Sequence, residues 1–334
     1  MKHLRKLLVL FLLLSCVACI RSHSQTPPPE LHPVDLELQV SVPFRFVAYG
    51  DTRFTDPNDT EASNAPVRRA LVQAIADLHP AFLSIGGDIV YNGNDANDWK
   101  VWDRETAVWR NARVPIYPAL GNHDLHGDLH VALSNYFQRF PDLKNSRYYS
   151  VRAANTLVLV LDSSLDEVSG PQWEWLTHKL ATLDPGVDFA LVVLHHPPYT
   201  SSSDTKMYGG GHSSRSQEQQ LAAALEARQQ NMRARLVVFA GHVHNYERHE
   251  HGGVTYFVTG GGGAHAYPIQ RRADDPFQSR EMNYHYLLGE VDRGQLRITM
   301  NRVELNNGRA AWTQPDSVII AVPTAAAAGA GRSK

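Results

Sequence analysis

Cysteine is almost absent from this chain of 334 residues. The only two, Cys16 and Cys19, both lie near the N-terminus. The rest of the sequence therefore has no internal disulfide to stabilise it. It also has no cysteine that could act as a nucleophile, and no serine motif points to a covalent route.

The chain also lacks an excess of charge of either sign. Its formal net charge is −2, with the 17 histidines counted as neutral. A nucleic-acid scaffold held by bulk charge is not expected from such a balance. Many of the histidines cluster in short segments, and imidazole is the commonest neutral metal ligand. The composition therefore favours metal chemistry over nucleic-acid binding.

The N-terminal apolar run, Leu7–Leu14, is too short for a convincing membrane span. A basic start precedes it and small residues follow it, which predicts a secretory signal peptide over residues 1–20. We therefore expect export, to the periplasm, to an outer-membrane anchor or to the medium. Cys16 or Cys19 resembles the modified cysteine of a bacterial lipoprotein. Membrane attachment through an N-terminal lipid and ordinary cleavage after a small residue both stay open.

The remaining organisation is simple. Residues 21–40 are rich in Pro, Ser and His and predict a tether. Residues 41–323 follow as one domain, in which we find no internal repeat and no break. The alanine- and glycine-rich residues 324–334 predict a disordered tail.

Short apolar runs and segments with helical spacing alternate along the domain. Phe44–Tyr49 and Ala81–Ile85 predict strands, and Ala65–Leu78 between them predicts a helix. Their crossover should be right-handed, so the two strands are expected to be parallel. Further strands are predicted at 114–120, 148–151, 156–161, 189–194, 236–239 and within 253–322. Further helices are predicted at 98–111, 128–139, 171–183 and 216–230.

Five of these strands end in polar clusters. The clusters are Asp51; Asp88 with Tyr91; Asn122 with His123; His195; and His242 with His244. Because the carboxyl ends of strands gather at one edge of a sheet, these groups should converge. Their oxygens and imidazoles suit Fe, Zn or Mn. One ion could not use so many ligands, but two could, and two cations can clamp the oxygens of a displacement at phosphorus.

The order and spacing of these blocks resemble the calcineurin-like metallophosphoesterase family, from about residue 44 to residue 264. The sequences Gly-Asp-Ile-Val-Tyr at 87–91 and Gly-His-Val-His-Asn-Tyr-Glu-Arg at 241–248 look like its purple acid phosphatase branch. The resemblance implies an α/β, four-layer fold in which a two-sheet β-sandwich is flanked by helices. It also implies an enzyme that hydrolyses small-molecule phosphomonoesters through metal-bound hydroxide, without a covalent phosphoenzyme.

The resemblance further implies a role for each residue. An Fe(III) ion would be held by Asp51, Asp88, Tyr91 and His244. A divalent Fe, Zn or Mn ion would be held by Asp88, Asn122, His195 and His242, with Asp88 as the bridge. His123 would face the substrate and protonate or stabilise the leaving oxygen, and Asp124 is placed to orient it.

Three other residues have open interpretations. Arg53 stands where the family commonly has a small residue, and it either contacts phosphate or lies on the surface. His212 follows three glycines in a polar loop, 198–215, and is either a substrate-side histidine or a solvated one. His196, beside the expected ligand His195, should orient a neighbour or pack against it.

The substrate stays open as well. A phosphodiesterase or a nucleotide phosphatase on the same metal pair is one alternative. A non-catalytic protein that retains the metals is another. The intact His123 argues against the second, because metal binding alone does not need it.

Overall fold

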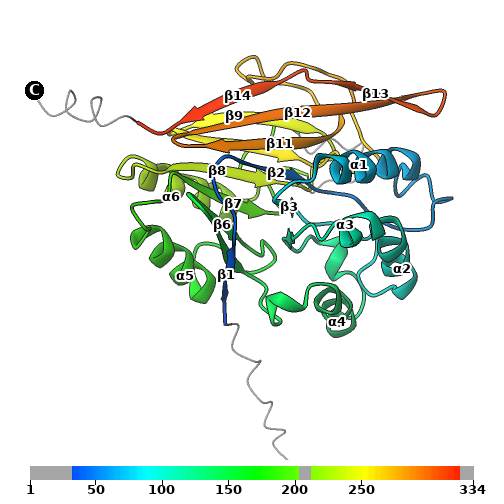
Figure 1. Cartoon of the computed structure of the whole chain (residues 1–334), viewed down its shortest axis with the longest axis horizontal. Helices are drawn as coiled ribbons and strands as arrows, with labels where there is room; N and C mark the ends of the chain where they lie inside the picture. The colour runs from blue at the N-terminus through cyan, green and yellow to red at the C-terminus, as the bar shows by residue number, and fades with distance from the viewer. Residues whose placement is uncertain (1–31, 203–211, 324–334) are drawn as a thin grey trace, which may run out of the picture. The chain divides into compact units, whose positions relative to one another are not determined.

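The computed structural model describes residues 32–202 and 212–323. Within these ranges two β-sheets of seven strands stack face to face, and helices cover their outer sides (Figure 1). The predicted α/β fold, a two-sheet sandwich flanked by helices, is confirmed.

The first sheet has the strand order β1-β5-β6-β7-β8-β10-β9. Its strands are β1 (Val34–Leu38), β5 (Tyr149–Ala153), β6 (Thr156–Val160), β7 (Phe189–Leu194), β8 (Arg235–Ala240), β9 (Tyr246–His251) and β10 (Val254–Thr259). The second sheet has the order β13-β12-β11-β2-β3-β4, and β14 also pairs with β12. Its strands are β2 (Phe44–Tyr49), β3 (Phe82–Ile85), β4 (Ile116–Pro118), β11 (Tyr284–Asp292), β12 (Gln295–Asn306), β13 (Arg309–Thr313) and β14 (Ser317–Ala321).

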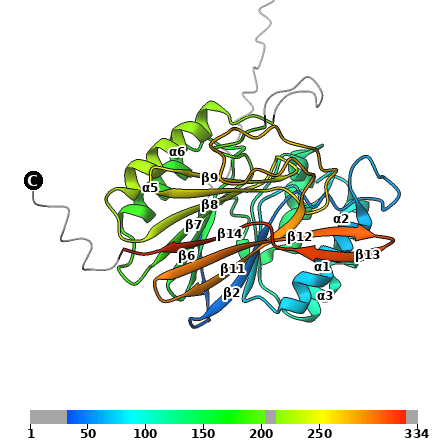
Figure 2. The same cartoon turned by 90° about the horizontal axis from the view of Figure 1, so that it is seen from above.

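Six α-helices and two short 3-10 helices connect the described strands. They are α1 (Ala65–Leu78), α2 (Ala96–Glu105), α3 (Ala107–Asn111), α4 (Leu129–Arg139), α5 (Gly170–Ala181), α6 (Ser216–Gln229), η1 (His123–Leu125) and η2 (Pro141–Leu143). Helices α5 and α6 lie together beside the first sheet in both views (Figures 1 and 2).

Strand β7 shows how the layers form. Its residues are buried on both faces, which explains its continuous apolar run. Leu191 and Val193 belong to the core between the sheets, and Ala190 and Val192 belong to the core that includes α5 and α6. Alternate side chains of β7 therefore pack into two different cores, one between the two sheets and one between the first sheet and helices α5 and α6.

The structure differs from the predicted tether at Val34–Leu38. These residues form β1, which pairs in parallel with β5. Val34, Leu36 and Leu38 are partly buried and pack on the core, whereas the acidic residues between them are exposed. This alternation is typical of a strand with one covered face. The tether prediction was therefore wrong for this part of 21–40.

The helix predicted over 98–111 is divided into α2 and α3. Thr106 lies between them, and both its amide and its hydroxyl donate to the carbonyl oxygen of Trp102, at 3.0 and 2.6 Å. The dihedral angles of Thr106 (φ −93°, ψ 9°) leave the helical range. The three tryptophans of this segment are buried in the core.

Several predicted segments lie outside the described residues. They are the signal peptide (1–20), the start of the tether (21–31), the centre of the polar loop (203–211) and the tail (324–334). Across the described ranges, no helix combines the length and apolar character that a membrane crossing requires.

Candidate metal centre

The five polar clusters meet at a common end of the two sheets. Strands β2, β3 and β4 are parallel neighbours in one sheet, and β7 and β8 are parallel neighbours in the other. Two hydrogen bonds join the loops that follow them. Nδ1 of His195 donates to the carbonyl oxygen of Gly86 (2.8 Å), and the amide of His242 donates to Oδ2 of Asp51 (2.9 Å).

Glycines permit this close approach. Gly87 has a φ of 87°, and a Cβ placed there would lie 2.7 Å from Nδ1 of His195. At Gly260 a Cβ would lie 2.2 Å from the carbonyl oxygen of Val243 and 2.8 Å from Oδ2 of Asp51. A side chain at either position would push the loops apart.

Three of the clustered residues adopt left-handed backbone. The φ angles are 56° at Asp51, 52° at Asp88 and 69° at His242. This region costs a residue other than glycine about 1–2 kcal/mol. Such strain is typical of functional sites, where the surrounding structure holds the residue in place.

Asp51 and His244 face each other at one side of the site. Both are buried, and Nε2 of His244 lies 3.5 Å from Oδ1 of Asp51. Neither atom has a hydrogen-bond partner in the described part of the chain. Nδ1 of His244 donates to the carbonyl oxygen of His265 (2.9 Å), so Nε2 of the neutral ring carries a lone pair. Two buried electron-pair donors at this distance fit a cation between them.

Burial sets the protonation of both groups. It raises the pKa of Asp51 to about 7, a shift that His195 opposes and Asp88 reinforces. It lowers the pKa of His244 well below its usual range, and the Arg53 guanidinium adds to that effect. A cation between the two would favour the ionised carboxylate and the neutral imidazole.

Asp88, Asn122 and His195 form the adjacent group. Nε2 of His195 lies 3.0 Å from Oδ1 of Asn122 and 3.3 Å from Oδ1 of Asp88. Because Nδ1 of His195 donates to Gly86, the neutral ring turns a lone pair toward two oxygen atoms. Burial raises the pKa of Asp88, but the interactions with His195 and with the Arg53 guanidinium outweigh it and lower the pKa overall.

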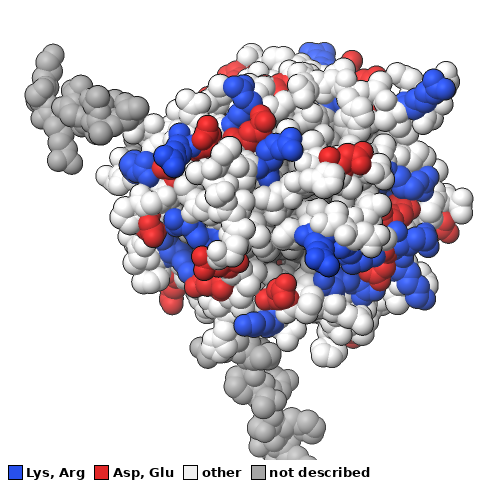
Figure 3. Space-filling model, viewed as in Figure 1, with Lys and Arg blue, Asp and Glu red and all other residues white. Residues whose placement is uncertain are grey.

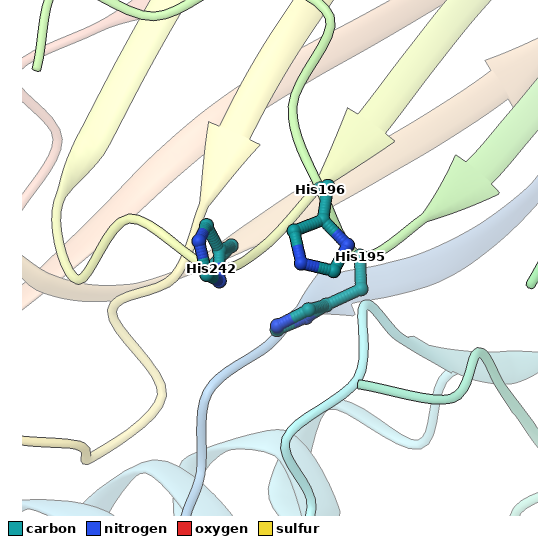
Figure 4. Close-up of side chains that lie close together, drawn as sticks. All are labelled: His195, His196 and His242. Carbon is teal, nitrogen blue, oxygen red and sulfur yellow. The ribbon is translucent and has the colours of Figure 1, made fainter. Parts of the chain in front are cut away.

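Asp88 links the two positions. One ligand atom from each of Asp51, Asp88 and His195 lies within 4.8 Å of the others, and so do ring nitrogens of His195, His196 and His242. Figure 4 shows the three imidazoles gathered where the loops after β7 and β8 meet. The donor atoms present therefore fit metal ions.

His196 was expected to orient or pack, and its contacts agree. Its Nδ1 lies 2.8 Å from the hydroxyl of Ser163, and its ring centroid is 4.4 Å from that of His242. Sequence reasoning missed Ser163. It follows β6, so the strand-end argument that found the other clusters could have found it too.

His123 is held at the rim of the site by two contacts. Its amide donates to Oδ1 of Asp88 (2.9 Å), and its Nδ1 donates to the carbonyl oxygen of Tyr91 (2.7 Å). Burial lowers the pKa of His123 to about 4, although the charge of Asp88 opposes the shift. The imidazole is therefore neutral at pH 7, and Nε2 is its free acceptor.

Asp124 differs from its predicted role. Its carboxylate accepts hydrogen bonds from the backbone amides of Ile89 (2.9 Å), Val90 (3.2 Å) and Gly121 (2.9 Å). The carbonyl of Tyr91, and not Asp124, orients the His123 ring. Burial and the nearby Asp88 raise the pKa of Asp124, and the three amide donors oppose this shift. Asp124 is thus a positioning residue that joins the loops after β3 and β4.

Arg53 is neither a surface residue nor remote from the site. Its Nη2 and Nε lie 3.2 and 3.4 Å from Oδ2 of Asp88, and its side chain is only 14% exposed. The guanidinium thus lies beside the carboxylate expected to bridge two ions.

Tyr91 and His212 both lie at the edge of the centre. The Tyr91 ring packs against His123, with 5.2 Å between ring centroids, and the residue is 38% exposed. Nδ1 of His212 lies 3.2 Å from the carbonyl oxygen of His242 and 3.1 Å from the hydroxyl of Tyr267. His212 is therefore packed against the centre and is not a solvated loop residue.

Comparison with known proteins agrees with this geometry. The family profile for calcineurin-like phosphoesterases matches residues 44–246. The chain belongs to the calcineurin-like phosphoesterase family. The predicted family is thus confirmed, and calcineurin-like phosphoesterases typically bind two metal ions.

Two phosphatases are similar to this chain over only part of their own length. A phosphoenolpyruvate phosphatase from onion (Allium cepa) is 31% identical over 194 residues, which are 54% of this chain and 37% of the onion protein. A purple acid phosphatase from yellow lupin (Lupinus luteus) seeds superposes with a TM-score of 0.58 and 18% identity, over 87% of this chain and 55% of its own. This chain therefore spans less than two thirds of either relative.

A third similar protein, by its structure, is GAP50, the anchor in the inner membrane complex of Plasmodium. It superposes with a TM-score of 0.56 and 17% identity, over 84% of this chain and 89% of its own. At this identity the two structural matches establish the shared calcineurin-like fold and nothing more specific.

Proposed function

We propose that this protein is an exported phosphatase that hydrolyses phosphomonoesters of small molecules with two metal ions. The main support is the pair of gaps between electron-pair donors: 3.5 Å between Asp51 and His244, and 3.0 Å between His195 and Asn122. Asp88 would be the shared carboxylate, because one of its oxygens lies within 4.8 Å of ligand atoms of both Asp51 and His195. The proposal also agrees with the phosphatase activity named for the onion relative.

The ligands divide into two sets around Asp88. The set for Fe(III) is Asp51, Asp88, Tyr91 and His244, and the set for a divalent Fe, Zn or Mn ion is Asp88, Asn122, His195 and His242. Carboxylate, phenolate, amide and imidazole donors suit these ions better than soft ones. When bound, the ions would polarise phosphate oxygens and lower the pKa of water at the site.

His123 supplies the proton in this proposal. Its Nδ1 is engaged by the Tyr91 carbonyl, so Nε2 is the atom that can gain and release a proton. At a pKa of about 4 the free ring is neutral. An anionic phosphate beside Nε2 would raise that pKa, so protonation is coupled to substrate binding. The proton then passes to the leaving oxygen, which matters most for poor leaving groups.

The surface charge supports a small substrate, and the N-terminal sequence supports export. The face in Figure 3 carries both basic and acidic side chains, which favours a small substrate over a long polyanion. The basic start and short apolar run of residues 1–20 support export, with or without a lipid on Cys16 or Cys19.

The test compares a chromogenic monoester with the matching diester. The full chain is stripped with a chelator, reloaded with iron and zinc, and assayed on p-nitrophenyl phosphate and bis-p-nitrophenyl phosphate. We expect faster hydrolysis of the monoester. A preference for the diester would indicate a phosphodiesterase, and no hydrolysis by metal-loaded protein would indicate a binding protein.

His123→Ala is the matched variant. It should keep the metal content of the wild type and lose more activity on an alkyl phosphate than on the nitrophenyl ester, which leaves without a proton. An equal loss on both substrates would assign His123 to binding and not to proton transfer.

A further inference from the structure

Arg53 places a permanent positive charge inside the metal centre. A guanidinium group carries a delocalised positive charge. That of Arg53 lies 3.2 Å from Oδ2 of the fully buried Asp88. Oδ1 of the same carboxylate accepts the amide of His123. Both oxygens of the expected bridging ligand are therefore engaged by groups of this chain.

The backbone around Arg53 fixes this placement. Its φ is 42°, and its amide donates to the carbonyl oxygen of Asp88 (3.0 Å). Its own carbonyl accepts from Nη1 of Arg68 (3.0 Å), and Arg68 is held in turn by both oxygens of Glu105 (3.0 and 3.2 Å). Hydrogen bonds thus hold both the amide and the carbonyl of Arg53, and its backbone is fixed beside that of Asp88.

We propose that Arg53 is a resident cation of the metal centre, which neutralises Asp88 in the metal-free protein and competes with a metal ion for Oδ2 of Asp88. This inference rests on the two-metal function proposed above. A metal ion at Oδ2 of Asp88 would approach the guanidinium that already lies 3.2 Å from this oxygen, and like charges repel each other. Any ion held there therefore binds against the charge of Arg53.

The expected size of the effect follows from known charge–charge shifts. An opposite charge beside a carboxylate changes its proton affinity by about one to three powers of ten. Competition for a metal ion should be of similar order. Removing the charge should therefore tighten the weaker metal position by about tenfold or more.

The experiment measures metal affinity and not turnover. The full chain and its Arg53→Gln variant are stripped with a chelator and titrated with Zn²⁺ against a chromophoric competitor, and zinc content is then determined by elemental analysis. Arg53→Lys keeps the charge, and Arg45→Gln removes an exposed arginine that donates to the carbonyl of Leu78. We expect tighter binding of the weaker Zn²⁺ in Arg53→Gln alone.

A second measurement follows the metal-free state. Without its resident cation, metal-free Arg53→Gln should melt at a lower temperature than the wild type, and it should gain more from added Zn²⁺. These two results together would support the proposal.

Two other results would refute it in distinguishable ways. The first is an equal Zn²⁺ affinity in wild type and Arg53→Gln, together with weaker binding of inorganic phosphate by the variant. This result would make Arg53 a phosphate ligand and leave the two-metal function intact. Failure of both proteins to bind two Zn²⁺ would overturn the two-metal function and this inference with it.

Discussion

Replacing Asp124 by Asn should loosen the metal centre without touching a metal ligand. The carboxylate is buried and accepts three backbone amides, two on Oδ1 and one on Oδ2. These amides belong to the loops that carry Asp88 and Asn122. An asparagine has a single acceptor oxygen, so its NH₂ group would face one of the amides.

The magnitude follows from that count. If the Asn oxygen keeps the amides of Ile89 and Val90, the amide of Gly121 loses its acceptor. A buried donor left without a partner costs about 1–3 kcal/mol. We therefore expect the free energy of unfolding of the Asp124→Asn protein to fall by about that amount, with each kcal/mol lowering Tm by about 2–4 °C.

Urea denaturation of chelator-treated protein measures this effect. The matched control is Asp166→Asn, because Asp166 also accepts two backbone amides, from Val168 and Ser169, but is exposed to water. Water can replace its bonds, so this control should stay within about 0.5 kcal/mol of the wild type. An Asp124→Asn protein as stable as the control would refute the positioning role.

Four further outcomes are expected. Arg68→Ala should lower the free energy of unfolding by about 3–5 kcal/mol, since it removes the buried partner of Glu105; a loss below about 1 kcal/mol in urea denaturation would contradict this. Asp88→Asn should lose both metal ions on purification, and full occupancy by elemental analysis would rule out a bridge. Iron-loaded protein should be coloured, and Tyr91→Phe should bleach it; an unchanged visible spectrum would mean that Tyr91 is no ligand. In metal-free protein the His123 imidazole should titrate by NMR near pH 4, whereas a midpoint at 6.5 or above would contradict its burial.

Much of the candidate centre was predictable because most of its residues come shortly after a buried strand. Strand ends of neighbouring parallel strands coincide in space, so the positions of Asp51, Asp88 and His195 along the chain were enough to bring them together. The direction of each side chain was not predictable. Asp124 reaches amides 34 and 35 residues away, and Arg53 reaches Asp88 across 35 residues. Such contacts depend on how separate loops pack, which no local pattern encodes.

The average composition of residues 21–40 led to the wrong prediction for the strand within them. Residues 21–40 as a whole have the Pro- and Ser-rich character of a tether, and that outweighed the alternation within Val34–Leu38. The partner of this strand is β5, more than a hundred residues away along the chain. Similarly, Thr106 has no strong helix-breaking signal, and the break between α2 and α3 coincides with the bond from its hydroxyl to the Trp102 carbonyl, a kind of bond that often bends helices.

The left-handed backbone at Asp51, Asp88 and His242 also bears on the stability of this chain. Glycine is the residue best suited to such φ angles, and it would relieve about 1 kcal/mol or more at each position. At Asp51 and Asp88 the carboxylates offset part of this cost, because they accept the amides of His242 and His123. The same groups that could hold a metal ion thus also hold the loops of the site in a backbone conformation that the chain would not adopt by itself.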